Sequence, residues 1–269
     1  MSDVNEPFIS GLVSVVMPAY NSAATLAAAI ESVLAQEYGE LELYVVDDHS
    51  VDATRRLAEA FGKKDARVRV LSTDSGKGVA PARNTALRRC RGEFVAFIDA
   101  DDRWDPEKLR VQLAALSDSG LALAATSYRV VDQHGADCGL VRIDGTAGYG
   151  DLLKGNVLGC STVVVDRTRT GTFLMPEEVN EDYLTWLALT KKYGPALCVR
   201  QVLATYTKSS ASLSGSKLRA AQWQWRVYRE VLKFSAVRSA YLFAHYACRG
   251  VGKHFFSGRS AERPSSNSA

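Results

Sequence analysis

The feature that most restricts the fold of this chain is the alternation, over its first hundred residues, of short apolar runs with amphipathic stretches. Apolar runs of four to six residues are typical of buried strands, and the stretches between them repeat apolar residues at helical spacing. Strands are predicted at residues 12–17, 41–46, 68–71 and 94–98, with helices after Ser22 and at 52–61 and 80–91. Strands joined by crossover helices pair in parallel with right-handed connections, so we predict an α/β fold with a doubly wound, mostly parallel, Rossmann-like sheet flanked by helices.

The alternation loosens after residue 100. Helices are predicted at 106–117 and 181–193, strands at 122–127, 162–165 and 199–206, and a hairpin or loop in the glycine-rich segment 128–150. We expect one α/β domain over residues 10–215 and a basic, aromatic-rich helical extension over 216–256. Residues 257–269 are too polar to bury a core and are expected to be disordered.

Composition argues against several classes of protein. No window of 18 uncharged apolar residues exists, which argues against a transmembrane helix, and the acidic N-terminus lacks the layout of a signal peptide. The five cysteines are scattered and form no CxxC pair. Reduced thiols in a cytoplasmic protein are therefore expected, and a zinc site is not.

Charge is divided unevenly along the chain. From residue 184 onward there are 14 Lys and Arg but two acidic residues, whereas residues 1–183 carry 19 basic and 28 acidic groups. An acidic front half suits cation binding, and a basic tail suits an anionic partner. Between residues 217 and 259 the basic residues interleave with aromatics, which favours a helix lying on an anionic membrane surface; the alternative is a helix that packs its aromatics on the protein. No nucleic-acid-binding motif is present, so no nucleic-acid partner is expected.

Three carboxylates, those of Asp99, Asp101 and Asp102, directly follow the apolar run FVAFI. Ligands of open parallel sheets bind beyond the carboxyl ends of the strands. Three acids within four residues repel one another unless a positive charge lies between them. Hard oxygen ligands of this kind suit Mg²⁺ or Mn²⁺ bridging phosphates, so the cluster is a candidate metal site. The alternative is an acidic turn that caps the helix expected at Pro106.

Polar residues also follow the first two predicted strands. They are Pro18, which is expected to end the first strand, with Tyr20 and Asn21, and then Asp47 and Asp48 after the second strand. A carboxylate in this place can accept hydrogen bonds from a base N–H or a ribose hydroxyl, and Tyr20 can stack on a base. The alternative for the acids is capping of the next helix, but Asp52 is better placed for that role.

The glycine-rich loops typical of nucleotide sites are missing from the sequence. No glycine lies between Leu12 and Tyr38, and Gly76-Lys77-Gly78 lacks the spacing of a phosphate-binding loop. A bound pyrophosphate would therefore meet a metal and basic side chains. Lys77 and Arg83 are the candidates, and surface charge is the alternative interpretation.

Taken together, these segments resemble family 2 glycosyltransferases, the inverting enzymes of the GT-A fold, and most of all the bacterial members that build surface polysaccharides. The matching stretches are VSVVMPAYN (13–21), ESVLAQ (31–36), YVVDDHSVD (44–52), GVAPARNTAL (78–87), GEFVAFIDADDRWDPEKL (92–109) and NEDYLTWLAL (180–189). The resemblance runs from about residue 12 to residue 215. No QxxRW motif is present, which favours transfer of single sugars over polymerisation.

The resemblance implies a role for each matching residue. Tyr20 and Asp48 would contact the nucleobase, and Arg83 would lie near the nucleotide. Asp99 would bind the ribose or order the metal site, and Asp101 and Asp102 would hold the metal. Asp182 would be the catalytic base with Glu181 in reserve, and Lys208 would approach a phosphate. Asn180 suits an N-cap, which puts Asp182 in the first turn of a helix, where the dipole favours its ionised form.

The implied function is one-step inverting transfer of one sugar from a nucleotide-sugar, UDP-linked as is usual in the family, to a hydroxyl of a saccharide or lipid-linked acceptor. Mn²⁺ or Mg²⁺ would be the cofactor, and the enzyme would be cytoplasmic, peripheral on the inner face of the membrane. Two alternatives stay open. A sugar-phosphate nucleotidyltransferase would need a Gly-rich basic loop after the first strand, and a non-catalytic nucleotide-sugar-binding protein could dispense with Asp182.

Overall fold

The computed structural model describes residues 8–208 and 217–256, so the tail predicted to be disordered lies outside the described residues. The chain divides into two compact units. The first comprises Met1–Leu152 and Asn156–Ser209, and the second comprises Leu153–Gly155 and Ser210–Ala269. Each unit is described separately below.

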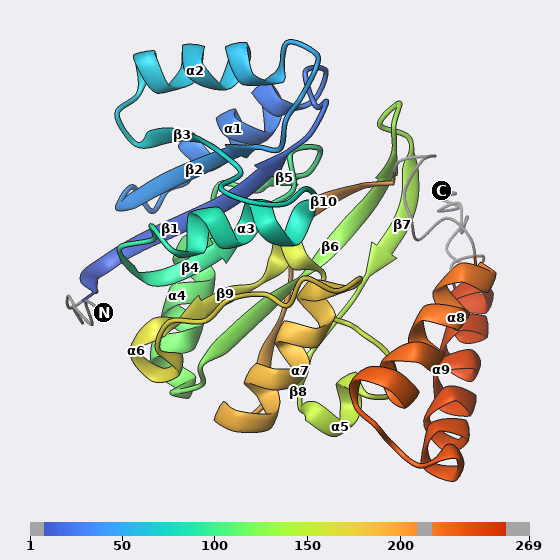
Figure 1. Cartoon of the computed structure of the whole chain (residues 1–269). Coiled ribbons are helices and arrows are strands. Elements are labelled where there is room, and N and C mark those ends of the chain that lie inside the picture. The colour runs from blue at the N-terminus through green and yellow to red at the C-terminus, as the bar shows by residue number, and fades with distance from the viewer. Residues whose placement is uncertain (1–7, 209–216, 257–269) are drawn as a thin grey trace, which may run out of the picture. The chain divides into compact units, whose positions relative to one another are not determined.

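The first unit is built on a mixed sheet (Figure 1). Its strands are β1 (Ile9–Ala19), β2 (Leu41–Asp47), β3 (Val68–Ser72), β4 (Gly92–Phe97), β5 (Arg103–Trp104), β6 (Leu123–Asp132), β7 (Asp137–Val141), β8 (Gly145–Ala147), β9 (Val164–Asp166) and β10 (Ala196–Lys208). The main path runs β3-β2-β1-β4-β9-β6-β10-β5, with β7 paired to β6 and β8 to β10. β3, β2, β1 and β4 are mutually parallel, as predicted, and the short β9 lies antiparallel between β4 and β6.

The predicted crossover helices are present between the parallel strands. They are α1 (Leu26–Leu34), α2 (Thr54–Lys64) and α3 (Val79–Leu87), followed in the second half by α4 (Lys108–Ser119), α5 (Tyr149–Leu152), the 3-10 turn η1 (Cys160–Thr162), α6 (Arg167–Thr170) and α7 (Glu181–Tyr193). The bounds predicted for α7 are confirmed. The prediction that Pro18 ends the first strand is wrong, because β1 continues to Ala19 and Pro18 still pairs with Val46.

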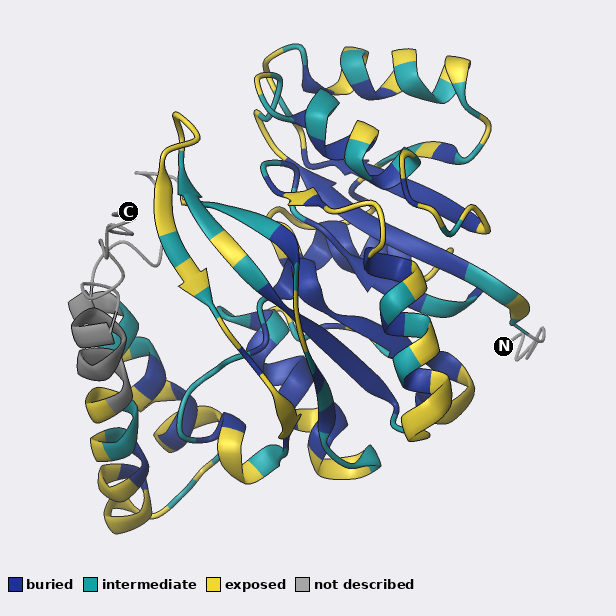
Figure 2. Ribbon diagram, turned by 180° about the vertical axis from the view of Figure 1, so that it is seen from behind, coloured by how far each residue is buried: buried dark blue, intermediate teal, exposed yellow. Residues whose placement is uncertain are grey.

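The core lies between the central strands and the helices that cover them. Val13, Val15 and Met17 of β1 are fully buried, and they belong to the same apolar cluster as Leu26 and Ile30 of α1. Figure 2 shows the central strands as the buried part of this unit, with exposed residues on the outer helices. The strands are thus uniformly apolar because both of their faces are covered.

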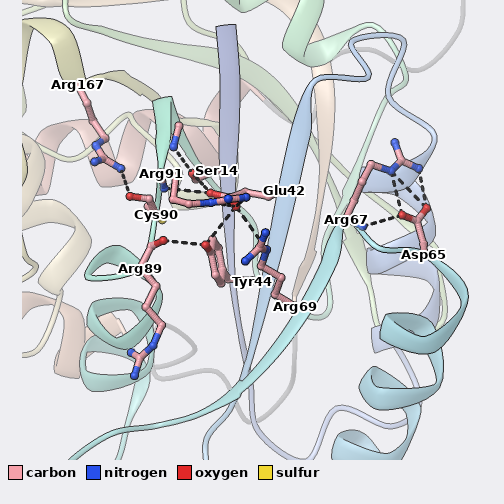
Figure 3. A network of polar contacts seen from close by, with 11 residues as sticks. Ser14, Glu42, Tyr44, Asp65, Arg67, Arg69, Arg89, Cys90, Arg91 and Arg167 are labelled. Atoms are coloured by element: carbon pink, nitrogen blue, oxygen red, sulfur yellow. Dashed lines mark hydrogen bonds and ion pairs between the residues drawn. The ribbon is translucent and has the colours of Figure 1, made fainter. Parts of the chain in front are cut away.

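A buried carboxylate, Glu42, joins three strands of the sheet at some distance from the carboxyl ends of the strands (Figure 3). Its oxygens accept hydrogen bonds from Ser14 Oγ at 2.7 Å, from Tyr44 Oη at 3.2 Å, and from the backbone N–H and guanidinium of Arg91 at 3.0 and 2.7 Å. Burial acts to raise the pKa of Glu42, but these donors outweigh it and the pKa is lowered. Glu42 is therefore a charged structural link between β1, β2 and the start of β4.

The second unit is helical, as predicted, with α8 (Lys217–Arg226), a π-helical turn (Val227–Val231) and α9 (Ala236–Phe256). Its aromatic rings pack on one another, since Phe243 lies 5.7 Å from Trp225 and 6.0 Å from Tyr246 between ring centroids. Tyr228 is buried and donates a hydrogen bond to the carbonyl of Leu153. Among the described residues, no helix is both long and apolar enough to cross a membrane.

Candidate nucleotide-sugar and metal site

The ends of β1, β2 and β3 lie level with one another, because Ala19 pairs with Asp47 and Asp47 pairs with Ser72. Polar residues that are far apart in the sequence therefore meet at one edge of the sheet. Asp48 is the best held of them: its Oδ1 accepts a hydrogen bond from Thr73 Oγ1 at 2.9 Å, and its Oδ2 accepts one from the Gly78 N–H at 2.6 Å. Gly78 precedes α3 with φ 110°, a conformation that favours glycine.

The residues around Asp48 divide into loop supports and exposed groups. Asn21 donates its N–H to Ser50 Oγ at 3.0 Å and accepts from the Val51 N–H at 2.9 Å, and Asp47 accepts from the Ser50 N–H at 3.3 Å. These two side chains shape the loops after β1 and β2. Tyr20 is 61% exposed and open to a ligand. Pro18 is buried within β1.

Asp52 contacts the start of the helix that follows it, although α2 begins at Thr54 and its N-cap position is Ala53 and not Asp52 as predicted. Its carboxylate accepts from the Thr54 N–H at 2.9 Å and from the Ala23 N–H at 3.1 Å. Asp52 thereby accepts from one donor at the start of α2 and ties it to the segment before α1. Asp48 takes no part in these hydrogen bonds, and its carboxylate stays at the edge of the sheet.

The acidic turn after β4 is held by residues from η1 and β10. Ser161 Oγ accepts from the Asp99 N–H at 3.0 Å and donates to Asp102 Oδ2 at 2.5 Å, while the Thr207 N–H donates to Asp102 Oδ1 at 2.9 Å. Thr207 Oγ1 also donates to the Asp101 carbonyl at 2.5 Å. Asp102 is fully buried and both of its oxygens accept from the protein. Its geometry is that of a support for the turn and does not favour the direct metal contact expected from the sequence.

Asp99 and Asp101 are the partly exposed carboxylates of the turn. Burial, and then the charge of Asp99, raise the pKa of Asp101 to about 6. A cation near these groups would relieve that repulsion. Among the described residues no group of three or more His, Cys, Asp or Glu is arranged to hold a metal ion. The carboxylates of Asp99 and Asp101 are hard oxygen ligands, which suit a Mg²⁺ or Mn²⁺ ion that completes its shell with phosphate oxygens and water.

Arg83, expected near the nucleotide, is the buried centre of an ion-pair network. From α3, its Nη2 lies 2.5 Å from Asp99 Oδ1 and its Nη1 contacts Glu181 Oε1. The side chain is 3% exposed. Arg83 thus connects the acidic turn after β4 with the start of α7, and it holds Glu181 in a structural contact that leaves Asp182 as the candidate base.

Asp182 lies in the first turn of α7, where the sequence analysis expected it. The N-cap residue Asn180 adopts a left-handed conformation, φ 61°, and makes no capping hydrogen bond with its side chain, so that part of the prediction is wrong. Asp182 Oδ1 accepts from the Tyr183 N–H at 2.7 Å. Burial, and then the charge of Glu181, raise the pKa of Asp182 to about 6, although Arg83 acts in the opposite direction. The start of the helix therefore does not hold this carboxyl at the low pKa that was expected.

The two predicted lysines lie on the surface. Lys77 is exposed in the loop between β3 and α3, and Lys208 is exposed at the end of β10. Residues 209–216, which follow Lys208, lie outside the described residues. Neither lysine is drawn into the network around Arg83.

Sequence reasoning missed Ser161 and Thr207, the two residues that hold Asp102. Both are small hydroxyl residues beside predicted strands, and nothing in their local sequence indicates that they reach a turn 59 and 105 residues away. Their role becomes visible only when η1 and β10 are placed beside the end of β4.

Residues 14–168 match the family described as glycosyl transferase family 2. Over 244 residues the chain is 36% identical to the "Putative teichuronic acid biosynthesis glycosyltransferase TuaG" of Bacillus subtilis, which covers 90% of this chain and 97% of that protein. Over 253 residues it is 34% identical to the "UDP-Glc:alpha-D-GlcNAc-diphosphoundecaprenol beta-1,3-glucosyltransferase WfgD" of Escherichia coli, with 94% and 98% covered.

Solved structures with a similar fold include S. aureus TarS 1-349 in complex with UDP-GlcNAc. That structure has a TM-score of 0.68 and 20% identity, and the match covers 92% of this chain and 74% of that chain. The mannosyltransferase PcManGT from Pyrobaculum calidifontis, in complex with GDP-Man and Mn²⁺, has a TM-score of 0.60 and 18% identity, with 90% and 75% covered. At these identities the likeness concerns the fold alone.

Proposed function

The chain belongs to glycosyltransferase family 2 and has the GT-A fold, and from this premise we propose that it is an inverting enzyme that transfers one sugar from a UDP-sugar to a hydroxyl of a saccharide or lipid-linked acceptor in cell-surface polysaccharide synthesis. The observation that carries the proposal is the arrangement around Arg83. One buried guanidinium joins the acidic turn to the helix of the candidate base. The turn that would hold the leaving group, at Asp99 and Asp101, is thereby linked to the start of the helix that carries the proposed base, Asp182.

The nucleotide is assigned to the ends of β1 and β2. Asp48, buried and fixed by Thr73 and Gly78, can accept a hydrogen bond from the N–H of a uracil, and Tyr20 offers an exposed ring for stacking. A UDP donor is supported by the relative WfgD, whose name specifies UDP-Glc, and by TarS, which was solved with UDP and with UDP-GlcNAc.

The metal is assigned to Asp101, with Asp99 beside it. A divalent cation there would supply positive charge to the diphosphate of the donor as its bond to the sugar breaks. Asp102, held by Ser161 and Thr207, keeps the turn in place from behind. Arg83 neutralises part of the charge of Asp99 and so fixes the direction of that carboxylate.

Asp182 is assigned as the base. It would accept the proton of the acceptor hydroxyl as that oxygen attacks the anomeric carbon from the face opposite the leaving diphosphate. One such displacement inverts the anomeric configuration and needs no covalent intermediate. Glu181 is fixed by Arg83, so we assign it a positioning role instead of the reserve base role suggested by the sequence.

The test is a thermal-shift and transfer experiment with UDP-glucose and Mn²⁺ on the full chain. We expect metal-dependent stabilisation that is lost in Asp101→Ala and kept in Asp118→Ala, which changes an exposed acid of α4. Stabilisation of Asp101→Ala equal to that of the wild type would contradict the metal assignment. Metal-dependent binding without sugar transfer to any acceptor would favour the non-catalytic alternative, and release of pyrophosphate from UTP and a sugar phosphate would favour the nucleotidyltransferase.

The helical unit supports a second part of the proposal, attachment to the cytoplasmic face of an anionic membrane. α9 contains no acidic residue, and its Val237 and Tyr241, one turn apart, are 82% and 60% exposed. A basic helix with exposed apolar residues on one side binds the surface of anionic bilayers. Trp225 and Phe243 pack on each other. The apolar contact with the membrane would therefore be made by Val237 and Tyr241.

Flotation of the full chain with phosphatidylglycerol vesicles tests the attachment. We expect binding that is absent with neutral phosphatidylcholine vesicles and strongly reduced by the double substitution of Val237 and Tyr241 to Asp. Glu59→Gln, on the exposed side of α2, is the matched control and should float like the wild type. Equal flotation of the double variant and the wild type would rule out this face of α9.

A further inference from the structure

The order of the strands separates the assigned subsites along the edge of the sheet. The nucleotide residues follow β1 and β2, and the acidic turn follows β4. Beyond β4 the path continues through β9 to β6 and β10, and β6 runs in the same direction as β4 because β9 is antiparallel to both. The carboxyl end of β6 therefore lies at the edge that carries the site, on the side of the acidic turn away from the nucleotide.

Tyr128 stands in the middle of β6, four residues after Ala124, which is aligned through Val164 of β9 with Ala96 of β4. This register places Tyr128 level with the acidic turn that follows β4. Burial, together with the charges of Tyr206, Asp102 and Asp182, raises the pKa of Tyr128 to about 12. The ring contacts Tyr206, the residue before Thr207, and lies against Gly159, two residues before Ser161. It therefore stands beside the two residues that hold Asp102 in the acidic turn. The side chain is half-buried and not fully enclosed.

The ring of Tyr128 is fixed by its neighbours. It meets the ring of Tyr206 from β10 edge to face, with 6.2 Å between centroids and 69° between planes. On another side it lies against Gly159, where an added Cβ would come within 3.2 Å of the ring. A side chain at position 159 would push the ring from its place, so the glycine before η1 allows this position of Tyr128.

We propose that Tyr128, braced by Tyr206 and Gly159, is the platform on which the acceptor sugar rests, and that the acceptor site therefore selects a pyranose with an apolar C–H face. This inference rests on the proposed function. An aromatic ring presents a rigid apolar surface with a polar tip, which suits a sugar that has an apolar face and hydroxyl edges. A pyranose resting beside Asp182 would bring one of its hydroxyl groups toward that carboxylate.

The experiment titrates a panel of methyl pyranosides into the full chain with UDP and Mn²⁺ present, and follows binding by saturation-transfer NMR with irradiation of the aromatic protons. We expect transfer to the C–H protons of one or more pyranosides. In Tyr128→Leu the dissociation constant should rise at least fivefold, while Tyr128→Phe, which keeps the ring, should stay within twofold of the wild type. Gly159→Ala should weaken pyranoside binding in the same way as Tyr128→Leu.

A donor-side variant provides the matched control. Tyr20→Leu should weaken UDP and leave the affinity for the pyranoside unchanged once UDP is saturating, which is the reverse of the pattern expected for Tyr128→Leu. Thermal stabilisation by UDP and Mn²⁺ reports separately on the donor site and on folding. If UDP and Mn²⁺ do not stabilise the wild type, that result counts against the proposed function. If UDP still binds and no pyranoside binds the wild type, or Tyr128→Leu binds pyranosides normally, the platform is overturned.

Discussion

Nη2 of Arg83 lies 2.5 Å from Oδ1 of Asp99, in an ion pair that connects helix α3 to the acidic turn after β4. The other end of the same guanidinium contacts Glu181 at the start of α7. Two segments separated by 82 residues in the chain thereby share one buried cation. This side chain therefore links the proposed metal turn to the start of the helix that carries the proposed base.

Replacing Arg83 should therefore damage stability and activity together. In Arg83→Met, Glu181 would keep its buried charge without a partner, and the loss of one partner of a buried ion pair typically costs about 3–5 kcal/mol. Arg83→Lys should recover little of this, because an ammonium group cannot reach both carboxylates as a planar guanidinium does. Urea unfolding and the rate of sugar transfer measure the two effects. Arg88→Met, on the exposed end of the same helix, should behave like the wild type.

The activity should fall in acid with the titration of Asp182. A base must be ionised before it can accept a proton, and burial raises the pKa of this carboxyl to about 6. The transfer rate at saturating donor should therefore drop as the pH falls through about 6 and level off above pH 7. Asp182→Asn should lower the rate by about a hundredfold or more, with UDP–Mn²⁺ stabilisation retained. A pH profile that stays flat down to pH 5 would contradict the assignment.

The same raised pKa predicts that Asp182→Asn is more stable than the wild type at neutral pH. The folded state binds the proton more tightly than the unfolded chain, so the wild type loses stability as the pH rises from about 4 to about 6. Above that window the ionised carboxyl costs roughly 1–2 kcal/mol, reduced from the full shift because the side chain is partly exposed. Thermal unfolding at pH 7.5 should show the gain, and at pH 3.5 the two proteins should melt alike.

The parts of the fold that could be predicted from the sequence are those set by residues close together in the chain. The alternation of apolar runs predicted the parallel strands, because each strand is buried on both faces and reads as a continuous apolar segment. α7 was predicted to the residue, since its acidic first turn and apolar spacing are local features. The place of β9 between β4 and β6, by contrast, follows from packing in three dimensions, and three residues carry little periodicity.

Within the candidate site the same division holds. Asp99, Asp101 and Asp182 could be singled out as candidates because carboxylates at a strand end or a helix start stand out locally. The contacts of Arg83 with Glu181 and of Asp102 with Thr207 could not be predicted, because these partners are about a hundred residues apart in the chain. A buried arginine and an exposed one look alike in a sequence, and so do a liganding and a supporting aspartate.

The support of Asp102 by Ser161 can be tested through the metal. Ser161→Ala removes the hydroxyl that joins the Asp99 N–H to Asp102, so the turn should be less well ordered around Asp101. Loss of such outer contacts typically weakens metal binding about 10–100-fold. Electron paramagnetic resonance of Mn²⁺ in the presence of UDP should show this weaker binding, and excess Mn²⁺ should restore much of the transfer rate. Ser117→Ala, on the exposed side of α4, is the control.

The network around Glu42 gives a prediction on stability alone. Glu42→Gln removes the charge that Arg91 pairs with, and at pH 7 we expect a loss of about 2–4 kcal/mol in the free energy of unfolding. Because the pKa of Glu42 is lowered on folding, its contribution is present above the pKa of the unfolded chain and is lost as the pH falls through the folded value. The difference between variant and wild type in urea unfolding should thus be largest near pH 7 and shrink in acid. Glu59→Gln, which breaks the exposed pair with Arg55, should change the free energy by less than about 1 kcal/mol at either pH. A Glu42→Gln effect that does not depend on pH would mean that shape and not charge holds these three strands together.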